Sequence, residues 1–329
     1  MRLGLIINCL LLICSSLLAQ QKKHQKTLLL MGSRFEITTI HDDAQLAWDG
    51  INAAITEVTR IEKLISSWDP NSQTSLINNN AGIKPVQVDA ELFLLIQRAV
   101  QISNITGGAF DISYASMDRI WKFDGSMEAM PTEELVKEAS SKIGFQNIQL
   151  NPSRREVFLK QNGMKIGFGA IGKGYAAQKA KEKIVALGIN NGVVNASGDL
   201  IAWGRDTNGE KFKVAIADPT NKDNVLMRLA VDNASVVTSG DYERYVMFND
   251  VRYAHIIDPR TGYPTTGVKS VSIICANPEL ADALSTSVFV LGVKQGLNLI
   301  NQLEGVECLI ITDKDKVKIS DRLELNNKS

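Results

Sequence analysis

MKIGFGAIGKGYAAQKAKEKI, at residues 164–184, joins an apolar segment to a glycine-rich turn and then to a helical pattern. The pattern predicts a strand over 164–168 and a helix over 173–187. Glycines let the backbone approach a ligand closely, and the first turn of a helix attracts anions. Lys173 would add a point charge for a phosphate, although the GxxxxGK[ST] spacing of a P-loop is absent. A plain tight turn with a surface lysine is the alternative interpretation.

The rest of the chain places this unit in a fold with many strands and few helices. Apolar residues recur at helical spacing over 44–66 and 90–104, Pro131 marks a third helix start, and a further helix is predicted over 278–291. Strand-like segments fill most of the second half: REVFLK, MKIGF, GVVNAS, KFKVAIAD, LMRLAV, ASVVTSG, VRYAHIID, KSVSIICA and VECLII. Because strands and helices do not alternate regularly, we expect an α+β fold with mainly antiparallel sheets and packed helices.

Composition limits the class of function. Of the 329 residues, 44% are hydrophobic, which is enough for a sizeable core. Basic and acidic residues number 36 each, so neither nucleic-acid binding through a basic face nor polybasic docking to a membrane is expected. Cys275 and Cys308 lie in apolar runs without zinc-site spacing and are expected to be buried thiols.

The first 19 residues have the pattern of a secretory signal peptide. Arg2 precedes an apolar run over 3–13, and small residues follow. We therefore expect an exported protein with a mature domain over 20–329. A membrane anchor is the alternative, although the run is short for a membrane span. Cys14 would carry the lipid if the protein were instead a membrane-anchored lipoprotein.

The helix predicted over 278–291 carries a possible metal site. Asn277 would cap this helix and Pro278 would open it. Asp282 and Thr286 are four residues apart, so a carboxylate and a hydroxyl share one face. Mg²⁺ prefers oxygen ligands and often takes only a few from the protein. A buried aspartate satisfied by nearby backbone explains the same residues without a metal.

One histidine lies within a motif, RYAHIIDPRTGYP at 252–264. His255 is predicted inside a strand that leads into a turn with Asp258, Arg260 and Thr261. Such a cluster suits acid–base chemistry or charge stabilisation. A strand histidine before an ordinary turn is the alternative.

Two aromatic residues could border a flat ring. Phe110 follows paired glycines in TGGAFD at 106–111 and would do so if it were exposed, although a helix end is the simpler interpretation. Trp68 lies in a predicted loop over 66–82 and is a candidate stacking surface. A further turn between strands is predicted at 239–241.

Taken in order, TGGAFD, GAIGKGYA, NASGDL, TSGDYERY, HIIDPRTGYP and ADALSTSVFVLG resemble the ApbE family, the FAD:protein FMN transferases. The similarity runs from MGSRFEI at 31–37 to ITDKDKVKIS at 311–320, and HIIDPRTG followed by ADALST is its most specific part. The resemblance implies a T-fold-related architecture and an enzyme that uses Mg²⁺ and FAD. Such an enzyme attaches FMN by a phosphoester bond to a Thr or Ser of another protein and releases AMP. Its acceptors would be exported or membrane proteins, such as redox-pump subunits or secreted reductases, and the enzyme itself would be periplasmic.

The resemblance also implies roles for individual residues. The family's metal ligands match Asp282, Thr286 and the backbone carbonyl of Ala170. Its flavin contacts match Met31, Trp68, Ala109, Phe110, Asp111 and Lys173. The family histidine implicated in catalysis matches His255.

The chain departs from the family pattern at three places. GFG at 167–169 stands where the family often has Asp-Leu-Gly, which removes an acidic flavin contact. SG at 197–198 replaces a Gly-Gly pair, and DIS at 111–113 stands in the place of FDPT. Two other functions stay open: a hydrolase that converts FAD to FMN and AMP, and a non-catalytic flavin carrier. The intact pair of Asp282 and Thr286 favours an enzyme over a carrier.

Overall fold

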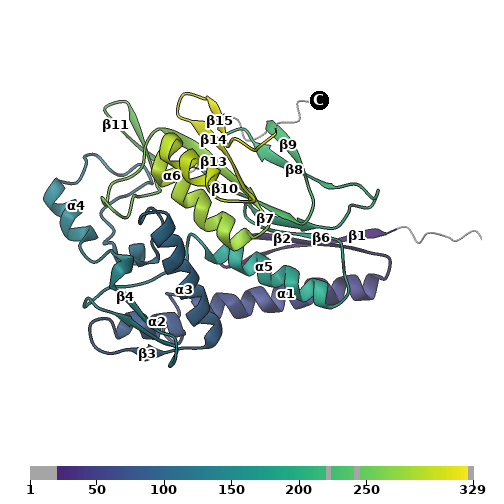
Figure 1. Cartoon of the computed structure of the whole chain (residues 1–329), viewed down its shortest axis with the longest axis horizontal. Coiled ribbons are helices and arrows are strands. Elements are labelled where there is room, and N and C mark those ends of the chain that lie inside the picture. Colours follow the sequence, from purple (N-terminus) through teal and green to yellow (C-terminus); the bar gives the residue numbers. More distant parts are fainter. Residues whose placement is uncertain (1–20, 220–223, 241–244, 325–329) are drawn as a thin grey trace, which may run out of the picture.

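The protein is built on an eight-stranded antiparallel sheet, seen in the computed structural model in Figure 1. The structure describes residues 21–219, 224–240 and 245–324. Across the sheet the strands follow the order β1, β2, β6, β7, β10, β13, β14 and β15. In that order their bounds are Lys22–Leu30, Ser33–His41, Gly192–Ala196, Asp199–Trp203, Ala234–Gly240, Val268–Cys275, Val306–Thr312 and Val317–Ile319.

The first hairpin of the sheet depends on a two-residue turn between β1 and β2. Leu30 pairs with Ser33, and φ is 51° at Met31 and 66° at Gly32. Positive φ at both central residues is typical of the turn whose twist matches that of the flanking strands. Strands β1 and β2 therefore form a tight hairpin, whose turn places Met31 at one end of the sheet.

Three helices cover one face of the sheet: α1 (Ala44–Ile65), α5 (Gly172–Ala186) and α6 (Pro278–Asn301) (Figure 1). The side chain of Asp43 caps α1, whose apolar residues recur every three or four positions. The main core lies between α1, α5 and the first strands and includes Phe35, Ile37, Ile51, Val58, Ala177, Val194 and Ile201. A second core lies between α6 and the central strands and includes Val237, Val271, Ile273, Leu284, Val288 and Ile310.

A separate hairpin, β8 (Phe212–Ala217) with β9 (Val225–Val231), packs on the other face of the sheet. Side chains alternate between the two faces of a strand. In β7, Ile201 and Trp203 therefore belong to the helix-covered core, whereas Ala202 packs against the hairpin. The side chain of Asp199 falls on the helix-covered side by the same alternation.

A smaller lobe lies at the left of Figure 1. It contains α2 (Gln73–Asn79), β3 (Val86–Gln87), α3 (Ala90–Ile105), η1 (Ile112–Ser116), α4 (Glu133–Ser140), η2 (Phe145–Asn147), β4 (Ile148–Asn151) and β5 (Glu156–Leu159). The strands pair in the order β3, β5, β4. Buried residues of α3 and β5 belong to the main core, so the lobe and the large sheet share one hydrophobic interior. A further hairpin, β11 (Tyr245–Phe248) with β12 (Val251–Ala254), precedes the HIIDPRTG turn.

The α+β prediction is confirmed, but four local predictions are wrong. No strand forms over 164–168, because this backbone bonds to a loop carbonyl and to the Asn78 side chain instead of to a neighbouring strand. His255 lies just beyond β12, which ends at Ala254. The predicted loop over 66–82 contains α2, because the side chain of Ser72 caps that helix.

The fourth error concerns the turn predicted at 239–241. Strand β10 continues through Ser239 to Gly240, paired with β13, and Asp241 lies outside the described residues. The predicted signal peptide, with Cys14, also lies outside them. The expected burial of Cys275 and Cys308 as free thiols is confirmed.

Within the described residues, α6 is the one helix whose length and composition would allow a membrane span. Half of its apolar window is buried inside the protein, and the backbone departs from helical geometry at Gly292. Helix α6 also packs against β10, β13 and β14. These features are those of a core helix.

Candidate active site

Helices α5 and α6 meet at Gly174. A Cβ atom at this position would lie 2.1 Å from the carbonyl oxygen of Pro278 and 2.8 Å from the Cβ of Asp282. Only glycine permits such an approach, because the neighbouring carbonyl belongs to the backbone. The GAIGKGYA and ADALST motifs, far apart in sequence, therefore form one structural unit.

Asp282 reaches across this contact to the first turn of α5. Its side chain is 4% exposed, and Oδ2 accepts a hydrogen bond of 3.0 Å from the backbone N–H of Gly174. The first N–H groups of a helix have no partner within the helix, and a negative charge there is favourable. Asp282 thus stabilises α5 from a neighbouring helix, and the hydrogen bond uses one of its two carboxylate oxygens.

Lys173 and Asp199 add two more charges at the same place. The ammonium group of Lys173 forms an ion pair with Asp199, the first residue of β7. Burial, together with the charge of Asp282, raises the pKa of Asp199 to about 8. Burial opposes the charged form of Lys173, but the carboxylates of Asp282 and Asp199 outweigh it and raise the pKa of Lys173. Two buried carboxyl groups thus lie near one ammonium group, which is bonded to Asp199.

Two hydroxyl residues of α6, Ser285 and Thr286, follow Asp282 in the sequence. Ser285 is fully buried, donates to the Asp282 carbonyl at 2.9 Å, and lies 2.8 Å from the hydroxyl of Ser239 in β10. These contacts fix α6 against the sheet. Thr286, one turn after Asp282 on the same side of the helix, is half-buried.

The predicted metal ligands fit a hard cation by their chemistry. A carboxylate at Asp282, a hydroxyl at Thr286 and the carbonyl of Ala170, two residues before α5, are all oxygen donors of the kind that Mg²⁺ prefers. Burial raises the pKa of both Asp199 and Asp282 beside this single lysine, and a divalent cation would favour the charged forms of the two carboxyl groups. In the described part of the chain no three His, Cys, Asp or Glu side chains gather as a metal site, so water and phosphate would have to complete the coordination.

His255 lies in the segment that follows β12. Its ring is 6.4 Å from that of Phe123 in an edge-to-face arrangement. The neighbouring residues Ala254 and Ile256 pack in the same core as Leu284 of α6. The segment is therefore anchored beside α6, although His255 is not in the strand where it was predicted.

The DPRTG turn meets the TGGAFD segment. Arg260 pairs with Asp258 through two hydrogen bonds of 2.9 and 2.7 Å, which hold the pKa of Arg260 above its usual value. A Cβ on Gly108 would lie 3.5 Å from the Cγ of Arg260. The turn and the glycine pair thus lie in contact, and the charges of Asp258 and Arg260 already satisfy each other.

Among the predicted flavin contacts, Met31 and Trp68 are accessible. The Cε of Met31 lies 3.7 Å from the position of a Cβ on Gly172, so the β1–β2 turn ends beside the start of α5. Trp68 is 79% exposed, and the guanidinium of Arg119 lies 5.2 Å from its ring centre. Trp68 therefore exposes an aromatic surface at the protein's surface, and its contact with a flavin stays a prediction.

Ala109, Phe110 and Asp111 are buried. Phe110 is 2% exposed in the main core, and α3 ends at Ile105, so the simpler interpretation of TGGAFD as a helix end is confirmed. Asp111 accepts hydrogen bonds from the backbone and hydroxyl of Ser113 and from the backbone N–H of Phe145. Burial nevertheless raises the pKa of Asp111 against these bonds. These contacts make Asp111 the cap of η1.

Gly167, which stands where the family often has an aspartate, has little space for a side chain. The Gly167 N–H donates to the carbonyl of Ile112 at 2.9 Å, and a Cβ at Gly167 would lie 3.0 Å from the Cβ of Ala115. Contacts this short leave little room for a side chain. The space that an aspartate would need is thus already occupied by Ala115.

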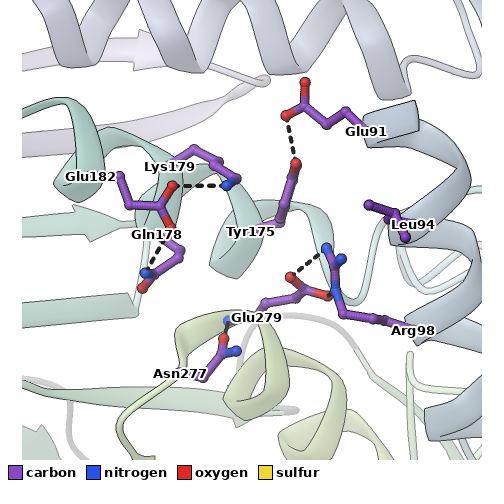
Figure 2. A pocket seen from close by; sticks show the side chains of 9 residues that line it. All are labelled: Glu91, Leu94, Arg98, Tyr175, Gln178, Lys179, Glu182, Asn277 and Glu279. Carbon is purple, nitrogen blue, oxygen red and sulfur yellow. Dashed lines mark hydrogen bonds and ion pairs between the residues drawn. The ribbon is translucent and has the colours of Figure 1, made fainter. Parts of the chain in front are cut away.

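A pocket of about 440 Å³ opens between α3, α5 and the start of α6. Figure 2 shows that its charged side chains pair with one another: Arg98 contacts Glu279 at 2.6 Å, and Tyr175 donates to Glu91 at 2.5 Å. The described residues that line it include none of the predicted ligands of FAD or Mg²⁺. We attribute the pocket to the packing of α3 against α5 and α6.

Comparisons with known proteins agree with this arrangement of motifs. The profile of the ApbE family matches residues 31–310. The chain belongs to the ApbE family. It is 33% identical over 290 residues to the FAD:protein FMN transferase of Treponema pallidum, covering 82% of this chain and 80% of that protein. It is 28% identical over 304 residues to a FAD:protein FMN transferase of Klebsiella pneumoniae, covering 92% and 93%.

Solved ApbE structures share the fold. The ApbE protein of Thermotoga maritima superposes with a TM-score of 0.81 at 31% identity, covering 91% of this chain and 97% of that one. The flavinyl transferase ApbE of Pseudomonas stutzeri, in its apo form, gives a TM-score of 0.81 at 24% identity, covering 92% and 96%. The mixed helical and antiparallel architecture is therefore that of ApbE proteins.

Asp199 of this ApbE chain is not among the residues to which the sequence pattern assigns a role. The residue lies within NASGDL, a motif that contributed to the resemblance, but no role was predicted for it. A Gly-Asp pair before a strand is common in turns, so its pattern alone carried no signal of a buried charge. Its pairing with Lys173, 26 residues away, appears only in the folded protein.

Proposed function

We propose that this ApbE-family protein is a Mg²⁺-dependent FAD:protein FMN transferase that acts outside the cytoplasm. The observation that carries the proposal is the cluster of buried Asp282 and Asp199 with half-buried Lys173 at the first turn of α5. Such a cluster suits a divalent cation and a diphosphate, whereas a simple flavin carrier has no need of it. The names of the relatives from Treponema pallidum and Klebsiella pneumoniae support the same activity.

The protein groups of the cluster have distinct tasks in this proposal. Asp282, Thr286 and the carbonyl of Ala170 would hold Mg²⁺, while Lys173, in the first turn of α5, would face the phosphates of FAD. When bound, Mg²⁺ supplies charge neutralisation at the diphosphate. Trp68 offers a face for stacking.

The remaining predicted flavin contacts help to shape the site. Met31 borders the start of α5. The segment from Ala109 to Asp111 acts through its backbone and its packing, because its side chains are buried. Ordered protein groups of this kind would position FAD before the acceptor arrives.

The proposed reaction exchanges one phosphorus–oxygen bond for another. The hydroxyl oxygen of a Thr or Ser on the acceptor protein attacks the phosphorus of the FMN half. The bond from that phosphorus to the bridging oxygen breaks, and AMP leaves with that oxygen. The hydroxyl proton passes to His255 or to a nearby carboxylate, and FMN remains attached through a phosphoester.

The proposed location outside the cytoplasm depends on the first 19 residues. N-terminal sequencing of the protein from its native host should find a mature chain that begins near Gln20. A lipid on Cys14 would instead support a form anchored to the inner membrane. An intact Met1 in the cytoplasmic fraction would refute export.

A single reconstitution tests the activity. The mature protein is incubated with FAD and Mg²⁺, with and without an exported flavoprotein acceptor such as a redox-pump subunit or a secreted reductase. Mass spectrometry should find FMN on one Thr or Ser of the acceptor and an equal amount of AMP in solution. The same acceptor with that residue replaced by Ala is the control. Release of FMN and AMP without an acceptor would indicate a hydrolase, and unchanged bound FAD would indicate a carrier.

A further inference from the structure

We propose that Arg119 is a positioning residue for flavin binding: its guanidinium group holds the indole ring of Trp68 from one face, so that the opposite face is presented to the isoalloxazine ring of FAD. The inference deepens the proposed function and rests on the flavin contact predicted for Trp68. Arg119 lies between TGGAFD and GAIGKGYA, outside the motifs that carry the family resemblance, and that resemblance assigns it no role.

Trp68 lies in a loop that reaches the start of α5. Helix α1 ends at Ile65, whose Cδ1 lies 2.8 Å from the position of a Cβ on Gly172 in the first turn of α5. The hydroxyl of Ser67 lies 4.0 Å from the position of a Cβ on Gly167. The loop therefore runs beside the turn that leads into α5, where the proposed site would hold the phosphates of FAD.

The backbone of this loop is fixed, whereas the side chain of Trp68 is not. The hydroxyl of Ser66 accepts hydrogen bonds from the backbone N–H groups of Trp68 at 3.2 Å and of Asp69 at 3.0 Å. The hydroxyl of Ser72 in turn donates to the Ser66 carbonyl. Trp68 is nevertheless 79% exposed, so little packing selects among its rotamers.

Arg119 supplies the restraint that packing does not. Its guanidinium carbon lies over the Trp68 ring, 5.2 Å from the ring centre. No carboxylate among the described residues forms an ion pair with Arg119, so the Trp68 ring is the partner of its guanidinium. A guanidinium is planar and weakly hydrated, which suits stacking on an aromatic face. Because Trp68 remains 79% exposed with Arg119 on one face, the other face is open to a ligand.

The segment that carries Arg119 is anchored on both sides. Before it, the hydroxyl of Ser116 donates to the Lys165 carbonyl at 2.8 Å and accepts the Lys165 N–H at 2.7 Å. After it, the buried indole of Trp121 donates to the Gly262 carbonyl at 2.9 Å. Two fixed backbones therefore bring the guanidinium and the indole together, and their contact orders the indole before FAD binds. Conformational entropy that is lost in advance no longer opposes binding.

The positive charge of Arg119 offers a different explanation for any effect on affinity. A cation near the site attracts the phosphates of FAD without a contact to Trp68. The two possibilities differ in their dependence on Trp68. If Arg119 acts through the ring, its removal has no further effect once Trp68 is gone. If its charge acts on the phosphates, its removal weakens binding equally with and without Trp68.

The test is a double-mutant cycle with FAD as the probe. Affinity is measured by titration calorimetry at one Mg²⁺ concentration on the mature wild-type protein, Trp68→Ala, Arg119→Met and the double variant. We expect Arg119→Met to weaken FAD binding about two- to fivefold, the size of an exposed cation–π contact. The double variant should lie within a factor of about 1.5 of Trp68→Ala. Lys122→Met removes an exposed charge from the same segment; it is the matched control and should change nothing.

Acrylamide quenching of tryptophan fluorescence gives a second readout, without FAD. The contribution of Trp68 is the difference between each protein and the same protein carrying Trp68→Ala. Removal of Arg119 uncovers the second face of the ring, so quenching of Trp68 should increase in Arg119→Met and stay the same in Lys122→Met. Unchanged quenching in Arg119→Met would show that the guanidinium does not cover the ring and would overturn the proposal.

Three binding results would also overturn the proposal. Equal losses from Arg119→Met with and without Trp68 would mean that Arg119 acts by its charge. Tighter FAD binding by Arg119→Met would mean that the guanidinium occupies the face that the flavin needs. Unchanged binding by Arg119→Met, beside a loss in Trp68→Ala, would remove this inference and leave the proposed function intact. If Trp68→Ala binds FAD like wild type, the predicted flavin contact fails first and this inference fails with it. Thermal unfolding of each variant confirms that it is folded.

Discussion

The backbone N–H of Gly174 donates a 3.0 Å hydrogen bond to Oδ2 of Asp282, so a carboxylate of α6 caps the first turn of α5. The two residues are 108 positions apart in the sequence. The bond gives Asp282 a structural task that is independent of any metal. Changes at Asp282 must therefore separate stability from activity.

Asp282→Ala should abolish FMN transfer and also lower the free energy of unfolding, by about 1–2 kcal/mol, because the cap of α5 is lost. Asp282→Asn keeps an oxygen acceptor for Gly174 but removes the charge. We expect it to lose transfer while it retains most of the stability. Urea unfolding and a transfer assay on both variants check this, and near-normal transfer by either at ordinary Mg²⁺ concentrations would refute the metal assignment.

Gly174→Ala should destabilise the protein by about 3 kcal/mol or more, because the new methyl group would overlap the Pro278 carbonyl. Gly169→Ala is the matched control in the same motif. A Cβ at Gly169 would have no neighbour within 4 Å, so its unfolding free energy should change little. Equal stability of the two variants would show that α5 and α6 are not in the contact described.

His255→Ala should slow transfer by about 10²–10⁴-fold, the usual contribution of a general base, and leave FAD affinity within a few-fold of wild type. His41→Ala, at the end of β2, is the control and should behave like wild type. Single-turnover transfer, FAD titration and thermal unfolding are measured on one preparation. A loss of FAD affinity in proportion to rate would make His255 a binding residue instead.

Trp68→Ala should weaken FAD binding about two- to tenfold, which corresponds to the ~0.5–1.5 kcal/mol of an aromatic stacking contact. Because Trp68 is 79% exposed, the free energy of unfolding should change by less than about 0.5 kcal/mol. Trp68→Tyr should retain most of the affinity. Fluorescence titration with FAD measures the effect, and unchanged binding by the alanine variant would place the flavin elsewhere.

Arg98→Met should destabilise the protein by about 1–3 kcal/mol. The change leaves the carboxylate of Glu279, which is 7% exposed, without its partner at the start of α6. Arg154→Met removes an exposed pair at 3.9 Å and should change stability by less than about 0.5 kcal/mol. Denaturant unfolding compares the two, and similar small effects would show that the Arg98 pair is not needed to hold α3 against α6.

Local patterns in the sequence determined the long helices and most of the strands of this protein, but not α2. Asn277 caps α6, as predicted, and α4 begins just after Pro131, where the third helix start was predicted. The shared face of Asp282 and Thr286 also follows from helical spacing alone. Each of these features depends on hydrogen bonds and side-chain periodicity within a few residues, which the sequence displays directly.

Only the tertiary structure decided what those elements bring together. The burial of Phe110, the pairing of Asp199 with Lys173 and the cap that Asp282 provides to α5 all depend on contacts between distant segments. Whether a charge is buried, and which partner it finds, depends on how α5 and α6 pack on the sheet. That packing is set by shape and by the close approach at Gly174, and no local pattern in the sequence encodes it.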